Sequence, residues 1–171
     1  MTVELISVGT EILMGSIVNT NAAFLSAGCA SIGLSIYNQQ VVGDNPDRLS
    51  DAINLALGRA DTVIITGGLG PTEDDITMQT AASVMGKGLV EDAHTREHIE
   101  NVLKNSIYKD NITDNNWKQA MVPEGAIVID NRNGTAPGII MERGDKALIL
   151  IPGPPNELEV MFRKDIKPYL M

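Results

Sequence analysis

Short apolar runs alternate with stretches of helical periodicity in the first half of the chain. Three of these runs have the length and residue types of strands, namely Val3 to Val8, Ser35 to Val42 and Thr62 to Thr66. The last of them is apolar enough to be buried on both faces of a sheet. Because helical segments separate the three runs, they predict parallel strands joined by right-handed crossovers.

The segments between and after these runs predict helices with one apolar face each. One begins at Pro46, where the missing N–H of proline costs no hydrogen bond. Others are expected after Asp75, over His94 to Ile107, over Asp114 to Ala120, and from near Pro155 onward. The positions expected to face inward are Ala22, Leu25, Cys29, Ile32, Leu49, Ala52, Ile53, Ala56, Leu57, Ala60, Ala81, Val84, Met85, Ile99, Val102, Leu103, Ile107, Leu158, Met161, Phe162, Ile166 and Leu170.

The second half predicts a change of strand direction. Ala126 to Asp130, Gly138 to Glu142 and Lys146 to Ile151 have strand character, and the short turn Arg143 to Asp145 joins the last two as a hairpin. The expected fold class is therefore α/β, a three-layer α/β/α sandwich with a mixed but mostly parallel sheet. No repeat or linker divides the chain, so residues 1–171 are expected to form a single domain.

Composition narrows the possible partners. Thirteen Lys and Arg residues stand against twenty-two Asp and Glu residues, which gives a formal net charge of −9. This balance argues against a nucleic-acid partner, because binding a duplex requires cations that displace counterions from phosphates. The one cysteine, Cys29, excludes an internal disulfide framework. No signal peptide or membrane-spanning run is visible, so we expect a cytoplasmic protein that does not bind membranes.

The segment from Thr66 to Asp75 carries the strongest chemical signal, because it lies between a buried strand and a helix. Ligands of open α/β sheets bind beyond the carboxyl ends of the strands. The glycines of this segment let the main chain turn sharply and present N–H groups to an anion. Asp74 and Asp75 follow, and two carboxylates beside a phosphate predict a bridging divalent cation such as Mg²⁺. The alternative is that Asp75 caps the next helix and Asp74 favours its dipole.

Two other strand ends bring polar groups to the same edge. Thr10 and Glu11 follow the first strand and offer a hydroxyl and a carboxylate. Asp44 follows the second strand, and its expected role is to cap the helix at Pro46, with ligand contact as the alternative. Asn21 is likewise expected as a helix cap, with contact to a sugar or base as the alternative.

The second half adds two loops and a few isolated candidates. The loops Asn133 to Gly138 and Pro152 to Glu157 are expected at the same sheet edge, where they can wall a pocket or simply turn the chain. Lys118 is either a phosphate-binding cation or a surface lysine, and Trp117 either stacks on a base or packs in the fold. His94 and His98 have a metal-compatible helical spacing, but no third ligand nearby supports a zinc site.

These motifs together resemble the N-terminal domain of the CinA family of competence/damage-inducible proteins, which is similar to molybdopterin-binding domains of the MoaB/Mog type. The resemblance covers essentially the whole chain, and the set of motifs is specific although each motif alone is weak. The matching segments are Val8 to Glu11, Gly15 to Asn21, Val42 to Asn45, Thr66 to Asp75, Asn116 to Ala120, Gly134 to Gly138 and Pro152 to Glu157.

The resemblance implies a metal-dependent pyrophosphatase that hydrolyses ADP-ribose to AMP and ribose 5-phosphate. It implies that Gly67, Gly68 and Gly70 face the phosphates, and that Asp74 and Asp75 hold the divalent cation. These two aspartates and Lys118 would be the catalytic residues. The other pocket residues implied are Thr10, Glu11, Asp44, Thr72, Thr135, Gly153 and Pro154. A homo-oligomer, either a dimer or a trimer, is implied as well.

Two other functions stay open at this point. The same glycine loop suits a protein that binds or adenylylates a pterin phosphate in molybdenum cofactor biosynthesis. A non-catalytic nucleotide-binding domain is the third possibility, because Trp117 stands where many relatives have an arginine. Two-domain relatives continue into a nicotinamide-mononucleotide deamidase domain, whose residues are not expected in this sequence. The chain is then either a natural stand-alone domain or a shortened form of a longer protein.

Overall fold

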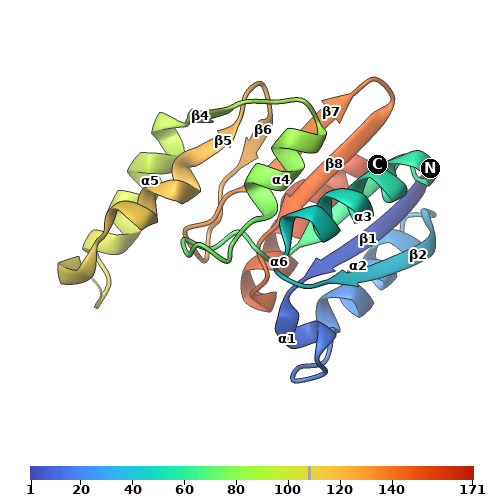
Figure 1. Ribbon diagram of the computed structural model, residues 1–171, viewed down its shortest axis with the longest axis horizontal. Helices are drawn as coiled ribbons and strands as arrows, with labels where there is room; N and C mark the ends of the chain where they lie inside the picture. Colours follow the sequence, from blue (N-terminus) through green and yellow to red (C-terminus); the bar gives the residue numbers. More distant parts are fainter. Residues whose placement is uncertain (108) are drawn as a thin grey trace.

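A computed structural model describes residues 1–107 and 109–171, and its centre is a six-stranded sheet with the order β2-β1-β3-β8-β7-β6 (Figure 1). Four neighbouring strands are parallel, and β7 is antiparallel to both of its neighbours. This confirms the predicted mixed, mostly parallel sheet. The strands are β1 (Thr2–Val8), β2 (Ser35–Val42), β3 (Thr62–Thr66), β6 (Ile127–Ile129), β7 (Gly138–Arg143) and β8 (Lys146–Ile151).

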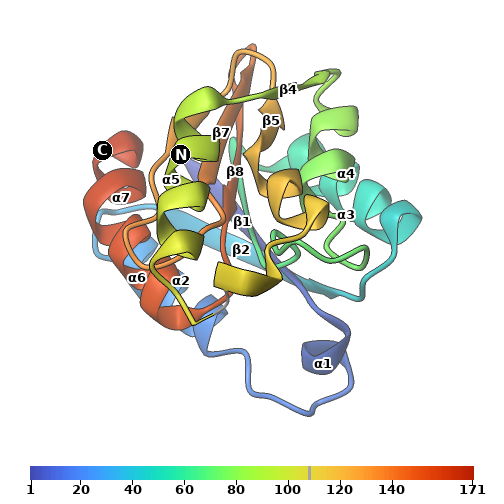
Figure 2. The ribbon, with the colours of Figure 1, turned by 90° about the vertical axis from the view of Figure 1, so that its left-hand side faces the viewer.

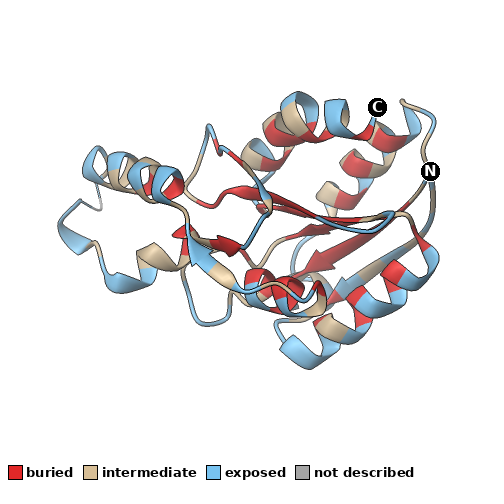
Figure 3. Cartoon of the chain, turned by 90° about the horizontal axis from the view of Figure 1, so that it is seen from above, coloured by how far each residue is buried: buried red, intermediate tan, exposed pale blue. Residues whose placement is uncertain are grey.

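Helices cover both faces of this sheet and form the two outer layers of the three-layer sandwich. Their buried residues face the sheet and their exposed residues face outward (Figure 3). One face carries α3 (Pro46–Arg59) and α4 (Thr77–Val84), and the other carries α2 (Thr20–Ala30) and α6 (Pro155–Met161). The chain continues from α6 through a π-helical turn, η3 (Phe162–Ile166), into α7 (Lys167–Leu170).

Strand alternation produces two hydrophobic cores, one on each face. In β3, Val63 and Ile65 point to the core under α3 and α4, whereas Ile64 points to the core under α2 and α6. Every residue of β3 is buried, as the sequence predicted for a strand covered on both sides. The layer architecture therefore follows directly from the period-two pattern of the strands.

A smaller unit extends from the β6 side of the sheet, on the left in Figure 1. It contains a two-stranded antiparallel sheet and the short helices that the sequence predicted in part. The predicted helix to Ile107 is wrong at its end, because the helix stops at Lys104 and the side chain of Ile107 is exposed. The elements are β4 (Leu89–Glu91), α5 (Ala93–Lys104), η1 (Lys109–Asn111), η2 (Asp114–Ala120) and β5 (Met121–Pro123). Within the described chain, no helix has the length and apolar character to span a membrane.

One ion pair joins the sheet to α3. Glu4 lies on a central strand and is 1% exposed, and its two carboxylate oxygens accept hydrogen bonds from Arg59 at 2.8 Å. Gln40 of the edge strand also donates to this carboxylate. These hydrogen bonds, with that of Arg59 the largest cause, lower the pKa of Glu4 below its usual value despite the opposing effect of burial.

The ion pair predicts a pH-dependent contribution to stability. A carboxyl group whose pKa is lower in the folded state stabilises the fold above its unfolded pKa, and this contribution is lost as the pH falls through the folded pKa. We expect Arg59→Met to lower the free energy of unfolding at pH 7 and to have a smaller effect at acid pH, where Glu4 becomes protonated. Urea unfolding of both proteins across this pH range measures the difference, and an equal difference at every pH would contradict the assignment.

Candidate functional site

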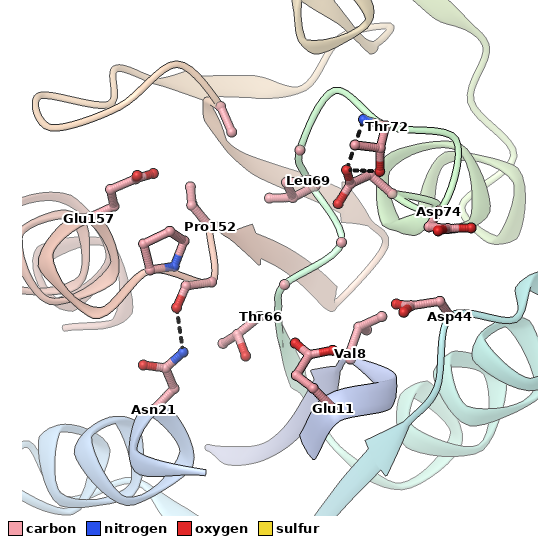
Figure 4. Close-up of a pocket in the computed structure, with 18 of the residues that line it drawn as sticks. Val8, Glu11, Asn21, Asp44, Thr66, Leu69, Thr72, Asp74, Pro152 and Glu157 are labelled. Atoms are coloured by element: carbon pink, nitrogen blue, oxygen red, sulfur yellow. Dashed lines mark hydrogen bonds between the residues drawn. The ribbon is translucent and has the colours of Figure 1, made fainter. Parts of the chain in front are cut away.

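A cleft of about 690 Å³ lies beyond the carboxyl ends of the parallel strands. Loops after β1, β2, β3 and β8 and the loop before β7 form its walls (Figure 4). Its volume is within the usual range of small-molecule sites, which is about 300–1,000 Å³. The helix α1 (Thr10–Leu13) and the loop that follows protrude from the body of the domain (Figure 2). They supply Glu11, Ile12 and Ile17 to the lining of the cleft.

The floor of the cleft is the glycine loop after β3, in a conformation that requires glycine. Gly67 and Gly68 have φ angles of 90° and 69°, which other residues rarely adopt. A Cβ on Gly67 would lie 2.3 Å from the carbonyl oxygen of Val8, and a Cβ on Gly68 would lie 2.1 Å from Oγ1 of Thr77. The loop is therefore specified by contacts with β1 and α4.

Neighbouring side chains hold the carbonyl groups of this loop. Thr77 donates its hydroxyl to the oxygen of Gly67 and its N–H to the oxygen of Gly68, and the buried Gln119 donates to the oxygen of Leu69. Among the described residues, no acceptor is found for the N–H groups of Gly68, Leu69 and Gly70. Three backbone donors are thus available to an anion, as in other anion-binding loops.

Asp75 fixes the end of the loop. Its carboxylate accepts hydrogen bonds from the N–H and the hydroxyl of Thr72, at 2.9 and 2.7 Å. The possible role of Asp75 as a helix cap is wrong. The helix α4 begins at Thr77, its N-cap residue is Ile76, and no side chain makes a capping hydrogen bond there. The role that Asp75 does have is to close the turn that places Asp74 in the lining of the cleft.

The charged side chains that line the cleft are all acidic. Five carboxyl groups line it, and its lining contains no Lys, Arg or His residue. Asp44 accepts a hydrogen bond from the hydroxyl of Thr10, and its predicted role as the cap of α3 is wrong because Asn45 caps that helix. The five are Glu11, Asp44, Asp74, Asp75 and Glu157.

These carboxylate oxygens are suitable ligands for a divalent cation that is bound together with a phosphate. Glu11, Asp44 and Asp74 lie on one side of the cleft (Figure 4). In the part of the chain that the structure describes, no three acidic, histidine or cysteine side chains come together as a complete metal site. Mg²⁺ prefers one or two carboxylates with phosphate oxygens and water, so the arrangement suits this ion better than a resident structural metal.

The opposite wall is a rigid backbone loop. Asn21 donates its side-chain amide to the carbonyl oxygen of Gly153 at 2.7 Å, which ties α2 to this loop. The expectation that Asn21 caps α2 is wrong, because Asn19 accepts the capping hydrogen bond from Ala22. Gly153 approaches the glycine loop so closely that a Cβ there would lie 3.4 Å from the Cα of Gly67.

Glu157 is the cleft residue that the sequence reasoning missed as an individual group. The sequence predicts that its motif, Pro152 to Glu157, lies in the pocket wall, but contains no signal that distinguishes this carboxylate from the rest of the loop. The buried side chain of Asn131 donates to it at 2.7 Å. Burial, the larger cause, raises the pKa of Glu157, and the hydrogen bond from Asn131 opposes this rise.

The remaining predicted residues divide between the cleft and its surroundings. Lys118 is not among the residues that line the cleft. Its ammonium group instead donates to the carbonyl oxygens of Thr72 and Asp75. Thr10 is also outside the lining and acts through Asp44. The residues that the structure does bring together in the lining are Glu11, Asp44, Gly67, Gly68, Gly70, Thr72, Asp74, Asp75, Thr135, Gly153 and Pro154.

The aromatic and histidine candidates have partners outside the cleft. The ring of Trp117 lies 4.4 Å from the guanidinium carbon of Arg96, a cation–π contact. His94 contacts the carboxylate of Asp130, whereas His98 contacts the carbonyl oxygen of Gly134. The two histidines therefore have different partners.

Comparisons with known proteins identify the family of this chain. A family profile described as "Probable molybdopterin binding domain" matches residues 4–171. The chain is 50% identical over 171 residues to a CinA-like protein of Kosmotoga olearia, a match that covers 100% of this chain and 41% of that protein. The chain thus spans about two fifths of the length of the curated relatives that it matches.

Solved structures show the same relationship. The crystal structure of CinA from Thermoplasma acidophilum, described as a protein with unknown function, matches with a TM-score of 0.89 and 35% identity over 98% of this chain and 96% of that one. The molybdopterin biosynthesis enzyme MoaB of Thermus thermophilus shares the fold, with a TM-score of 0.58 and 15% identity over 99% and 95% of the two chains. The chain therefore belongs to the molybdopterin-binding-domain family, and its likeness to CinA of T. acidophilum and to the CinA-like protein of K. olearia places it among the CinA-like members.

Proposed function

We propose that this domain hydrolyses the pyrophosphate bond of a small nucleotide such as ADP-ribose, with the help of a divalent cation. The observation that carries the proposal is the composition of the cleft. Five carboxyl groups and no basic side chain line the cleft, and among the described residues no acceptor is found for three N–H groups of its glycine loop. Free donors attract phosphate oxygens, whereas the carboxylates repel them unless a cation lies between the two.

In the proposed reaction, the glycine loop binds the phosphates and the carboxylates bind the cation. The N–H groups of Gly68, Leu69 and Gly70 bind non-bridging phosphate oxygens and stabilise the charge that develops on them. Asp74, with Asp44 or Glu11, would hold the cation. When bound, such a cation neutralises phosphate charge and lowers the pKa of a water molecule. The water oxygen bonds to one phosphorus while the P–O bond from that phosphorus to the bridging oxygen breaks. The departing phosphate keeps the bridging oxygen, and the protons of the water pass to the product phosphates and the solvent, which gives AMP and ribose 5-phosphate.

Two positioning residues support this arrangement. Asp75 holds Thr72 and thereby sets the direction of the segment that carries Asp74. Lys118 donates to two carbonyl oxygens of the same segment and so helps to hold its main chain in place. Neither group has to touch the substrate for the loop to keep its shape.

A turnover assay tests the proposal. Purified protein is incubated with ADP-ribose and either EDTA, Mg²⁺, Mn²⁺ or Ca²⁺, and AMP is measured by chromatography. We expect AMP only when a divalent cation is present, with full loss in EDTA. Binding of ADP-ribose without AMP formation under any cation would instead indicate a non-catalytic domain, and equal turnover in EDTA would contradict the role of the carboxylates.

A second candidate function is the binding or adenylylation of a pterin phosphate. The family description favours it, because the matching profile is named for molybdopterin binding. The same loop and carboxylates suit a pterin phosphate with ATP and Mg²⁺. Thermal shifts with ADP-ribose, ATP and a pterin phosphate separate the two candidates, and a shift with the pterin alone would reverse our ranking.

A further inference from the structure

Glu157 lies apart from the other acids of the cleft. Glu11, Asp44 and Asp74 line the side near β1, β2 and the glycine loop, whereas Glu157 lies on the opposite side, on α6 (Figure 4). A cation held by Asp74 with Asp44 or Glu11 would leave Glu157 free to contact another part of a bound nucleotide. The role of this carboxylate therefore differs from that of the cation ligands.

The wall around Glu157 fixes the position of its carboxylate. Asn131 is 2% exposed and donates to Oε2 of Glu157 at 2.7 Å, and it also donates to the carbonyl oxygen of Ala136 at 2.8 Å. Gly134 lies against the carboxylate so closely that an added Cβ would be 2.5 Å from Cδ of Glu157. His98 in turn contacts the carbonyl oxygen of Gly134 at 2.9 Å.

The carboxylate keeps one oxygen for a ligand. Among the described residues, Oε2 accepts from Asn131 and no donor is found for Oε1. Pro152, Pro154 and Pro155 also line the cleft and have no N–H to offer it. A carboxylate oxygen for which no donor is found calls for a donor on the ligand, and a second phosphate would be repelled there.

We infer that Oε1 of Glu157 accepts a hydrogen bond from a ribose hydroxyl of the bound nucleotide and so selects ligands that carry a ribose next to the pyrophosphate. Carboxylates bind ribose hydroxyls in this way in dinucleotide-binding folds. The inference rests on the proposed hydrolysis and names the substrate feature that the site recognises.

The test pairs one substitution with a panel of substrates. Kinetic constants of the wild-type protein and of Glu157→Gln are measured with ADP-ribose and with analogues that each lack one ribose hydroxyl. We expect Glu157→Gln to raise KM for ADP-ribose roughly tenfold, because a charged acceptor is replaced by a weaker neutral one. We also expect kcat to change much less. For the analogue that lacks the recognised hydroxyl, the substitution should have no effect on KM.

Two further variants keep the result unambiguous. Glu159→Gln is the matched control, because Glu159 lies on the same helix, outside the cleft lining, and contacts Arg163. Gly134→Ala should reproduce the KM effect by displacing the Glu157 carboxylate. If Glu157→Gln raised KM equally for every analogue, the inference about the ribose hydroxyl would be wrong, but the proposed hydrolysis would stand. The same would follow if a pterin phosphate bound more tightly than ADP-ribose and this binding depended on Glu157. Failure of the wild-type protein to hydrolyse ADP-ribose with any cation would instead overturn the proposed function.

Discussion

Replacing Asp74 with asparagine is expected to lower kcat/KM for ADP-ribose by at least about 100-fold, because the cleft then loses an ionised oxygen ligand for the cation. Asp74 is the exposed acid that the glycine loop places in the cleft after the turn closed by Asp75. The substitution keeps size and shape, so the fold is expected to be unchanged. Steady-state assays over a range of Mg²⁺ concentrations should show the largest difference at low Mg²⁺.

The neighbouring residue offers a matched control for this prediction. Glu73 is also exposed but lines a different hollow, with Lys118, outside the cleft. We therefore expect Glu73→Gln to retain nearly all activity. If Asp74→Asn kept its Mg²⁺-dependent turnover, or if both substitutions reduced it equally, the assignment of Asp74 as a cation ligand would be wrong.

Replacing Gly67 with alanine should both destabilise the fold and abolish activity. The residue has a φ of 90°, and the added Cβ would lie 2.3 Å from the backbone oxygen of Val8, which cannot rotate away. A strained φ and a backbone collision together are expected to cost about 2–4 kcal/mol. This corresponds to a fall in Tm of roughly 5–15 °C for a domain of this size. Thermal unfolding followed by circular dichroism measures the loss.

Gly58 provides the contrast for Gly67. It lies in α3, and an added Cβ there would meet no atom within 4 Å. Alanine favours helix over glycine by about 0.5–1 kcal/mol, so Gly58→Ala should raise Tm slightly. A tolerated Gly67→Ala, with a Tm equal to that of the wild-type protein, would show that the loop does not need its left-handed conformation.

The sheet and the location of the site were predictable from the sequence for a physical reason. A strand covered on both faces has few polar positions, so Thr62–Thr66, with its apolar centre Val63 to Ile65, stands out as a strand. Once the strands are known to be parallel, their carboxyl ends meet at one edge, and the polar segments after them gather there. This is why Glu11 and Asp74 could be assigned to one edge before any distance was known, whereas Asp44 and Thr135 are implied as pocket residues by the family resemblance.

The individual partners of the polar side chains could not be predicted. Asn19 and Asn21 are both chemically suited to cap a helix, as are Asp44 and Asn45, and the choice depends on contacts with distant parts of the chain. Asn21 bonds to Gly153, which is 132 positions away, and Asp44 bonds to Thr10, which is 34 positions away. Sequence periodicity contains no information on such contacts.

The small unit beside β6 was hard to predict for a different reason. The strands β4 and β5 have three residues each, which is too short for a recognisable alternation of apolar and polar positions. Ile107 matches the helical spacing, yet the helix ends before it and its side chain is 88% exposed. Short elements of this kind are specified by their tertiary contacts more than by their own pattern.

The most direct test is a calorimetric titration with a methylene-bridged analogue of ADP-ribose, which cannot be hydrolysed, in the presence of Mg²⁺ and of EDTA. A cleft with five carboxyl groups and no basic side chain should bind this anion only when the cation is present, and Asp74→Asn should weaken the Mg²⁺-dependent binding. Equal affinity in Mg²⁺ and in EDTA would contradict the account, because the phosphates would then be bound without the bridge that the carboxylates require.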